Sequence, residues 1–296
     1  MAKALAGQNA PSELLTRFAQ PDTVVVVTGQ QVGLFGGPAY TLYKALTAAK
    51  LAADLTARGI SAVPVFWMAT EDHDFAEVNH TWVFNADGDA SRVGVEAAVV
   101  GQRPAGEYPV PHPPVEALLA AMRGLPEADA IATMAREAYR PGATMGAGFR
   151  ALILKLLERV GVLVLDPLDP AVRAVGAPLL ADAVQKAPAL KAALLARGKE
   201  LSEAGYHAQV LVEDKTSLFF LLENGQRTTL RLKDAECASL ADRAADVSPN
   251  ALLRPVWQDF MLPTVAYVGG PGELAYFAQS AVLYRELLGR MPVMLR

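Results

Sequence analysis

Cysteine is nearly absent from this sequence, since Cys237 is the only one among 296 residues. A single cysteine excludes an internal disulfide framework and any metal site built from several thiolates. Cys237 lies in ECASLADR, which has the pattern of a helix, away from every glycine-rich loop. No electropositive neighbourhood that would activate a thiol is visible there, so we expect Cys237 to serve packing.

The sequence also lacks a basic surplus and a long apolar run. Its 27 basic and 31 acidic residues give a formal charge of −4, whereas nucleic-acid-binding proteins usually carry a basic excess. No apolar run reaches the roughly 18 residues that span a bilayer, and residues 1–18 lack the basic-then-apolar pattern of a signal peptide. We therefore expect a cytoplasmic protein with neither a nucleic acid nor a membrane as partner.

Hydrophobic residues make up 52% of the chain, which is ample for a core. Several short apolar runs are each followed by a turn and a helical pattern, as in buried parallel strands. Alternating strands and helices predict an α/β fold, a doubly wound parallel sheet covered on both faces. The expected strands are Thr23–Thr28, Ala62–Met68, Val162–Leu165, Thr264–Val268 and, as a fifth, Pro292–Leu295.

The helix expected over Ala39–Ala57 has an apolar face and a charged face. Lys44, Lys50 and Asp54 are expected to point to solvent. The face expected against the sheet consists of Leu42, Leu46, Ala49 and Ala53.

Two insertions, at about residues 80–140 and 205–245, are expected within one core of residues 1–296. The first alternates from Trp82 to Val99 around an Asp87-Gly88 turn, like an antiparallel pair of strands. The second has the pattern of a three-stranded meander, QVLVED, SLFFLLE and RTTLRL, with turns at Asp214-Lys215 and Asn224-Gly225.

Three loops at the carboxyl ends of expected strands carry unusual residues, and ligands of open parallel sheets bind at such ends. The first loop is GQQVGLFGGP, whose glycines let backbone amides approach a ligand. A tight turn would explain the glycines but would not require two adjacent amide side chains. The candidate substrate-binding residues of this loop are Gly29, Gln30, Gln31, Gly33, Gly36 and Gly37.

The second loop is TEDHD, with three carboxylates and an imidazole in consecutive positions. Like charges so close raise one another's pKa, which favours acid/base chemistry near neutral pH. Helix capping by Asp72 or Asp74 is the structural alternative. The candidate catalytic residues are Glu71, Asp72, His73 and Asp74, with Asn79 and His80 as nearby binding candidates.

The third loop is GGPGE, preceded along the chain by the segment SPNALLRPVWQD. Arg254 is a candidate carboxylate clamp, with a surface arginine as the alternative. Glu273, in the first helical turn, is either part of the site or a complement to the helix dipole. The candidate binding residues of this region are Arg254, Gln258, Gly269, Gly270, Gly272 and Glu273.

Four segments together resemble the bacillithiol biosynthesis cysteine-adding enzyme family: VVVVTGQQVGLFGGPAYTLYKA, PVFWMATEDHDFAEVNH, SPNALLRPVWQD and TVAYVGGPGELAYFAQ. The match is collinear from about Ala19 to Arg296, and its strings GQQxGLF and TEDHD are rare. The resemblance implies a Rossmann-like core of the nucleotidylyltransferase and class I tRNA synthetase type, with two insertions. It also implies a C-terminal coiled coil that the sequence does not reach, so a homodimer is expected only where that segment is supplied.

The reaction that the resemblance implies joins L-cysteine to glucosaminyl malate in the last step of bacillithiol biosynthesis. The activating cosubstrate is left open, a nucleotide such as ATP being the candidate. The His-x-Gly-His motif of the superfamily is absent, and Gly29-Gln30-Gln31 stands in its place, so adenylylation of the usual type is not supported by the residues. Within this reaction the acidic cluster would act as base or orient the substrate, and Arg254 would hold a carboxylate.

Two alternatives stay open from the residues alone. One is a core fragment that binds a ligand without turnover. The other is a metal-dependent hydrolase that uses the cluster from Glu71 to His80. No metal is expected, because His73 and His80 belong to different predicted elements and a preformed tetrahedral site needs converging ligands.

Overall fold

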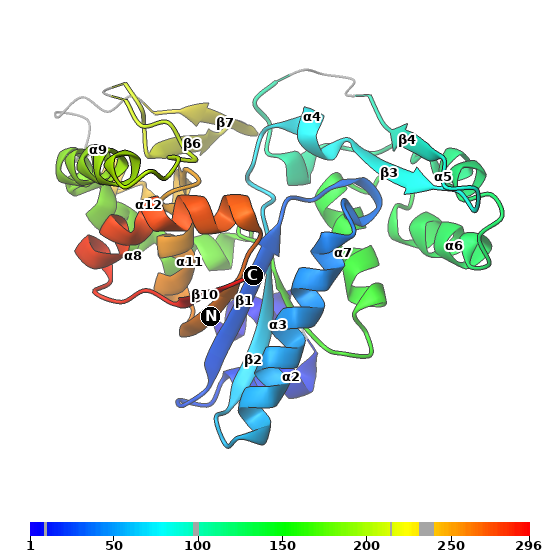
Figure 1. Ribbon diagram of the computed structural model, residues 1–296, viewed down its shortest axis with the longest axis horizontal. Coiled ribbons are helices and arrows are strands. Elements are labelled where there is room, and N and C mark those ends of the chain that lie inside the picture. Colours follow the sequence, from blue (N-terminus) through cyan, green and yellow to red (C-terminus); the bar gives the residue numbers. More distant parts are fainter. Residues whose placement is uncertain (9–10, 97–100, 214, 231–239) are drawn as a thin grey trace.

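A computed structural model describes residues 1–8, 11–96, 101–213, 215–230 and 240–296 (Figure 1). Its centre is a five-stranded, fully parallel sheet with the order β10-β9-β1-β2-β5. All five expected strands are confirmed. They are β1 (Val24–Gln30), β2 (Ala62–Met68), β5 (Leu163–Leu165), β9 (Thr264–Val268) and β10 (Val293–Leu295).

The strand order reverses direction at β1. The chain runs from β1 outward to β2 and β5 on one side, then returns to β9 and β10 on the other side. Both β2 and β9 pair with β1, so that Val27 lies between Val65 and Tyr267. This is a doubly wound, Rossmann-like arrangement, in which the crevice for a ligand opens between the carboxyl ends of β1 and β9.

Helices cover both faces of the sheet (Figure 1). On one face lie α3 (Tyr40–Ala57) and α7 (Met145–Leu156). The opposite face is covered by the N-terminal helices and by three later helices, with α9 (Ala187–Glu203) packed outside them on α12. These covering helices are α1 (Ala2–Gly7), α2 (Ser12–Phe18), α8 (Pro170–Gln185), α11 (Arg254–Met261) and α12 (Pro271–Leu287).

The orientation expected for α3 is wrong in part. Leu46 is 41% exposed, whereas Lys44 is 7% exposed. The residues that face the sheet are the small ones, Ala45, Ala48 and Ala52. The helix lies across β1, β2 and β9, and small side chains let it approach the strands closely. This rotation buries the Lys44 side chain and brings its ammonium group to the carboxyl end of the sheet.

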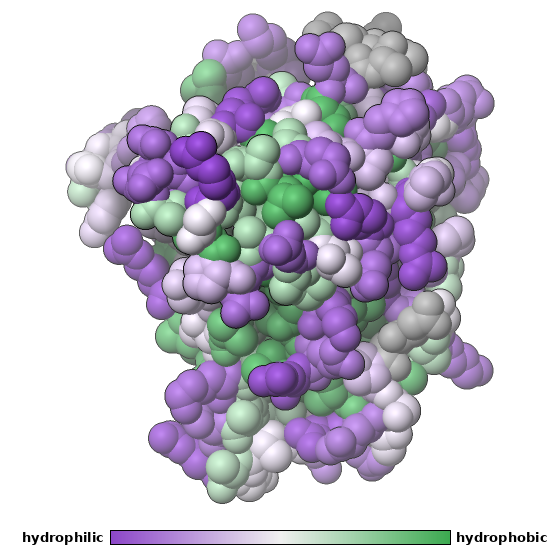
Figure 2. Space-filling view, turned by 90° about the vertical axis from the view of Figure 1, so that its right-hand side faces the viewer, coloured by the Kyte–Doolittle hydropathy of each residue, from purple (hydrophilic) through white to green (hydrophobic). Residues whose placement is uncertain are grey.

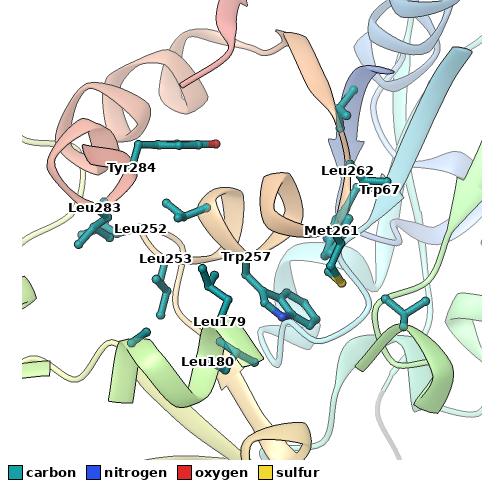
Figure 3. Close-up of a cluster of buried hydrophobic side chains, with 14 of the residues drawn as sticks. Trp67, Leu179, Leu180, Leu252, Leu253, Trp257, Met261, Leu262, Leu283 and Tyr284 are labelled. Carbon is teal, nitrogen blue, oxygen red and sulfur yellow. The ribbon is translucent and has the colours of Figure 1, made fainter. Parts of the chain in front are cut away.

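The largest core cluster joins β2 to α8, α11 and α12. Trp67 of β2 meets Trp257 of α11 edge to face, with ring centroids 5.5 Å apart. Figure 3 shows Trp257 beside Leu179 and Leu180 of α8. The indole of Trp257 fits because Gly176 of α8 has no side chain, since a Cβ there would lie 2.1 Å from Trp257 Nε1.

We expect Gly176→Ala to destabilise the protein by about 1–3 kcal/mol, because the added methyl group overpacks α8 against Trp257. Gly198 of α9 is the matched control, because a Cβ at that position meets nothing within 4 Å. Gly198→Ala should stabilise by about 0.5–1 kcal/mol through helix propensity. Urea denaturation of both variants measures the contrast, and equal free energies of unfolding would contradict it.

The first insertion contains the expected hairpin, with the Asp87-Gly88 turn between its strands. Residues 97–99 of that expectation lie outside the described residues. The insertion stands over the carboxyl end of the sheet, and the face that carries it is mostly hydrophilic with small apolar groups between (Figure 2). Its elements are α4 (Phe75–Val78), β3 (His80–Phe84), β4 (Ala90–Gly94), η2 (Ala105–Glu107), α5 (Val115–Ala121) and α6 (Ala128–Ala138).

The second insertion forms a three-stranded sheet with the order β7-β6-β8. Its strands are β6 (Phe219–Glu223), β7 (Gln226–Thr229) and β8 (Val247–Pro249), followed along the chain by α11. The hairpin at Asn224-Gly225 is confirmed, and both residues have positive φ, as a tight two-residue turn requires. The turn expected at Asp214-Lys215 includes Asp214, which lies outside the described residues.

The expectation that QVLVED forms the third strand is wrong. The backbone of Val210 instead exchanges two hydrogen bonds with the Gln279 side chain of α12, at 2.9 and 2.8 Å. A segment held in this way by a helix cannot pair with β6, and β8 takes that position. Cys237 lies outside the described residues. No helix in the described part of the chain is both long and apolar enough to cross a membrane.

Candidate functional site

A cavity of about 680 Å³ opens beyond the carboxyl ends of β1 and β9, at the reversal of strand order. The loops after β1, β2 and β9 all contribute to it, so the three loops expected to converge do meet at one end of the sheet. Nine of the candidate residues line this cavity: Gly29, Gln30, Gln31, Asp72, Arg254, Gly269, Gly270, Gly272 and Glu273.

The other candidates lie outside the cavity lining. Among them, three glycines shape the loop after β1: Gly36 and Gly37 have φ values of 94° and 67°, and a Cβ on Gly33 would lie 2.7 Å from Gly37 Cα. For these three the geometry is that of a tight turn, so the structure does not support direct substrate contact. The remaining candidates outside the lining are Glu71, His73, Asp74, Asn79, His80 and Gln258.

Glu273 is the centre of a hydrogen-bond network on one wall of the cavity. Its Oε2 accepts from Lys44 Nζ at 2.6 Å and from the Gly270 amide at 2.7 Å. Its Oε1 accepts from the Tyr267 hydroxyl at 2.7 Å. Lys44 also donates to the Gly29 carbonyl at 2.6 Å. Glu273 therefore both caps the first turn of α12 and joins the ends of β1 and β9.

Burial changes the acidity of the groups around Glu273. The pKa of Lys44 is lowered, because burial disfavours its charge more strongly than Glu273 favours it. The pKa of Tyr267 is raised well above its ordinary value, first by burial and then by the Glu273 carboxylate. Tyr267 is therefore a protonated donor at neutral pH. The wall thus offers a carboxylate, a desolvated amine and a phenol within one hydrogen-bond network.

Arg254, at the start of α11, lines the same cavity and is held by Tyr276 of α12. Its Nη2 donates to the Tyr276 hydroxyl at 2.7 Å, and its Nη1 is 3.4 Å from Gln258 Oε1. Burial acts to lower the pKa of Arg254, but Tyr276, Tyr267 and Glu273 raise it above its ordinary value. Its charge is therefore retained, and the alternative of an ordinary surface arginine does not hold.

Gln258 supports Arg254 from behind rather than lining the cavity. Its Nε2 donates to Asp259 Oδ1 at 3.1 Å. Asp259 is fully buried and also accepts hydrogen bonds from Thr264 and Tyr284. Burial raises the pKa of Asp259, and these hydrogen bonds act in the opposite direction.

Asp72 stands on the far wall of the cavity, in the loop after β2. Its Oδ2 accepts from Gln31 Nε2 at 2.7 Å, which links the loops after β1 and β2. Its Oδ1 accepts from the His73 amide at 2.8 Å and from the Asp74 amide at 3.4 Å. Asp72 therefore holds the backbone of its own loop and does not cap α4, whose N-cap residue Asp74 makes no side-chain cap hydrogen bond either. It also presents a carboxylate to the cavity.

Glu71 is turned away from the cavity and forms a buried ion pair with Arg173 of α8. The two residues are 4% and 7% exposed. Arg173 also donates to the carbonyls of Ala245 and Val247, each at 2.6 Å. These contacts join the loop after β2 to the second insertion, and they give Glu71 a structural position in place of the expected catalytic one.

His73 Nδ1 lies 2.9 Å from Arg227 Nη1, and His80 Nδ1 lies 3.0 Å from Asn79 Oδ1. Asp74 is exposed beside them. No group of three or more His, Cys, Asp or Glu side chains in the described ranges is arranged to hold a metal ion. The two histidines thus have separate partners, and the geometry does not favour the metal-dependent hydrolase.

Two groups of residues at the site are not among those predicted from the sequence: residues that line the cavity, and arginines that hold the acidic loop. Lys44, Tyr40 and Tyr43 line the cavity from α3, and Tyr267 and Tyr276 line it from β9 and α12. Lys44 was assigned to solvent, although a lysine one helical turn after the glycine loop is a signal for a nearby anion. Arg173 and Arg227 are far along the chain from the loop they hold, and no local pattern marks them.

These features define a Rossmann-like core with a polar cavity at the switch point of a doubly wound sheet. The chain belongs to the BshC family: the family described as "Bacillithiol biosynthesis BshC, N-terminal Rossmann-like domain" matches residues 2–296.

Curated relatives bear the name "Putative cysteine ligase BshC". The protein of Solibacter usitatus is 54% identical over 299 residues, covering 98% of this chain and 57% of that protein. The protein of Koribacter versatilis is 41% identical over 278 residues, covering 90% of this chain and 52% of that protein. The protein of Salinibacter ruber is 36% identical over 287 residues, covering 89% of this chain and 52% of that protein. This chain therefore spans about half the length of these relatives.

Proposed function

We propose that this chain is the substrate-binding and catalytic core of a ligase that joins L-cysteine to glucosaminyl malate, the last step of bacillithiol biosynthesis. The family and the names of the relatives support the cysteine ligase activity. The observation that carries the proposal for this chain is the single cavity at the switch point, where carboxylate, amine, phenol and guanidinium groups converge.

Amide formation requires three things of the protein's own residues. The attacking amine must lose a proton, the cysteine carbonyl must be oriented, and the carboxylates of the substrates must be bound. Asp72 is the candidate proton acceptor, and Glu273 is the second candidate on the opposite wall. Arg254 is the candidate partner of a malate or cysteine carboxylate, because a guanidinium offers two parallel donors to a carboxylate.

A nucleotide such as ATP is the candidate source of activation, and the described residues do not form a cradle for its phosphates. Lys44 Nζ and the Gly270 amide are donors that a phosphate could use, but both donate to Glu273. The glycines that precede α3 form a turn outside the cavity.

The test is incubation of this chain with glucosaminyl malate, L-cysteine and candidate nucleotides, followed by mass spectrometry. The expected product is bacillithiol, and the fate of each nucleotide identifies the activating cosubstrate. A full-length relative treated in parallel shows whether the reaction needs the rest of the protein. Binding of both substrates without product in either protein would favour the binding module without turnover.

We further propose the cytoplasm as the location, because a chain with one cysteine makes no use of an oxidising compartment.

Arg254→Met should raise the KM for one carboxylate substrate by about tenfold to a hundredfold, the value of a hydrogen bond to a charged group. The turnover number should change less, since the contact exists in both ground and transition states. Arg254→Lys is the control, because it keeps the charge but loses the planar pair of donors. Steady-state kinetics with each substrate varied in turn measures the effect, and an unchanged KM in Arg254→Met would contradict the assignment.

A further inference from the structure

His73 is the one histidine in the acidic loop, and its ring is held by a residue of the second insertion. Arg227 of β7 places Nη1 2.9 Å from His73 Nδ1. A guanidinium has donors only and stays charged, so Nδ1 must be the acceptor of this hydrogen bond. A neutral imidazole that accepts at Nδ1 carries its hydrogen on Nε2.

The Arg227 side chain is fixed on every side, so it cannot turn away from His73 at little cost. Its Nε donates to Ser248 Oγ at 3.0 Å, and its Nη2 donates to the Pro249 carbonyl at 2.9 Å. Its guanidinium lies 3.7 Å from the centre of the Phe220 ring, and the residue is 7% exposed. The donor that faces His73 Nδ1 is therefore held in place by contacts that do not involve His73.

Asp72 is the nearest acidic group, with Oδ1 3.9 Å from His73 Nδ1. That oxygen already accepts hydrogen bonds from two backbone amides. The Nε2 atom of His73 makes no hydrogen bond with any described residue, and the His73 side chain is 32% exposed. The Nε2 end of the ring is therefore a partly exposed donor, on the residue that follows Asp72 in the chain and just outside the lining of the cavity.

We propose that His73 is a neutral hydrogen-bond donor through Nε2 and not a base, and that Arg227 is the positioning residue that sets this tautomer. Both nitrogens of such a ring are used, one as acceptor from Arg227 and one as N–H, so no lone pair remains to take a proton from an amine. Because His73 lies just outside the cavity lining, its proposed partner is an oxygen of a substrate that extends past Asp72, one that gains negative charge during the reaction. This role for His73 rests on the proposed function, whereas the tautomer and its cause do not.

The first experiment needs no substrate. The chain is labelled with ¹⁵N-histidine, and the signals of His73 are assigned by comparison with His73→Gln. Two-bond and three-bond ring correlations at neutral pH then identify the protonated nitrogen. We expect hydrogen on Nε2 alone. Hydrogen on Nδ1, or on both nitrogens, would overturn the proposal whatever the protein catalyses.

Arg227→Met tests the cause of the tautomer. We expect a mixture of both tautomers for His73, because the donor to Nδ1 is gone. Arg243→Met is the matched control, since Arg243 is an arginine near the same small sheet that pairs with Glu223 and Asp246 at the surface. The Arg243→Met variant should leave the His73 signals unchanged. An unaltered Nε2–H tautomer in folded Arg227→Met would remove the positioning role, and if this variant does not fold, the wild-type spectrum still decides the tautomer.

In an active enzyme, steady-state kinetics of two His73 variants distinguishes a hydrogen-bond donor from a general base. His73→Gln keeps an N–H donor near the place of Nε2, whereas His73→Leu has none. We expect kcat to be about tenfold lower in His73→Leu than in His73→Gln, with similar KM, as the loss of one hydrogen bond predicts. If His73 were a base, kcat would fall equally in both variants. Absence of turnover in the wild-type enzyme would count against the proposed function alone, because the NMR result stands without it.

Discussion

Asp72→Asn is expected to lower turnover by about 100-fold to 10,000-fold, the usual contribution of general acid/base help. Asp72 is the carboxylate of the acidic loop that lines the cavity, whereas Glu71 is paired in the interior. The asparagine keeps an oxygen for the amides of His73 and Asp74. It removes the charge and places an NH2 group where Oδ2 accepts from Gln31 Nε2, a contact that the Gln31 amide restores by turning its oxygen inward. Substrate affinity should therefore change far less than turnover.

Melting temperature and single-turnover rate, measured on the same preparations, separate this role from a structural one. A role in holding the loop backbone alone predicts a stability loss of about 1 kcal/mol with near-normal turnover. Asp74→Asn is the control, because Asp74 carries the same charge in the same loop but is exposed and outside the cavity. Normal turnover in Asp72→Asn would return Asp72 to a structural role and make Glu273 the candidate base.

Arg173→Met should destabilise the protein by about 3–5 kcal/mol, because it leaves the Glu71 carboxylate buried without its partner. Arg173 also donates to the carbonyls of Ala245 and Val247. The same change therefore loosens the second insertion from the loop that carries Asp72. Urea denaturation followed by circular dichroism measures the free energy of unfolding.

Two comparisons test the cause of this loss. Arg243→Met removes a solvent-exposed pair and should leave the free energy of unfolding nearly unchanged. The double variant Glu71→Gln with Arg173→Met should recover part of the stability, since no unpaired charge is left in the interior. A loss under 1 kcal/mol in Arg173→Met, or no recovery in the double variant, would show that the ion pair is not what stabilises this junction.

The central sheet follows from the sequence alone, because the signals for its strands are local. Each central strand is an apolar run next to a turn, and the parallel order places three loops at one end. Asp72, Glu273 and Arg254 could therefore be assigned to one region before any coordinates were known. The rare strings GQQVGLF and TEDHD carried the resemblance to the family in the same way, since they are contiguous in the chain.

The face of each element on which those residues lie, and the distant residues that hold them, depend on how the elements pack in three dimensions. Small alanines against the strands rotated α3 and brought Lys44 to the site. Gln279 of α12 kept Val210 out of the small sheet. Arg173 lies 102 residues from its partner Glu71, and Arg227 lies 154 residues from His73. Such pairs form because packed elements meet across the fold, and no periodicity or spacing within one segment encodes which charges will be buried together.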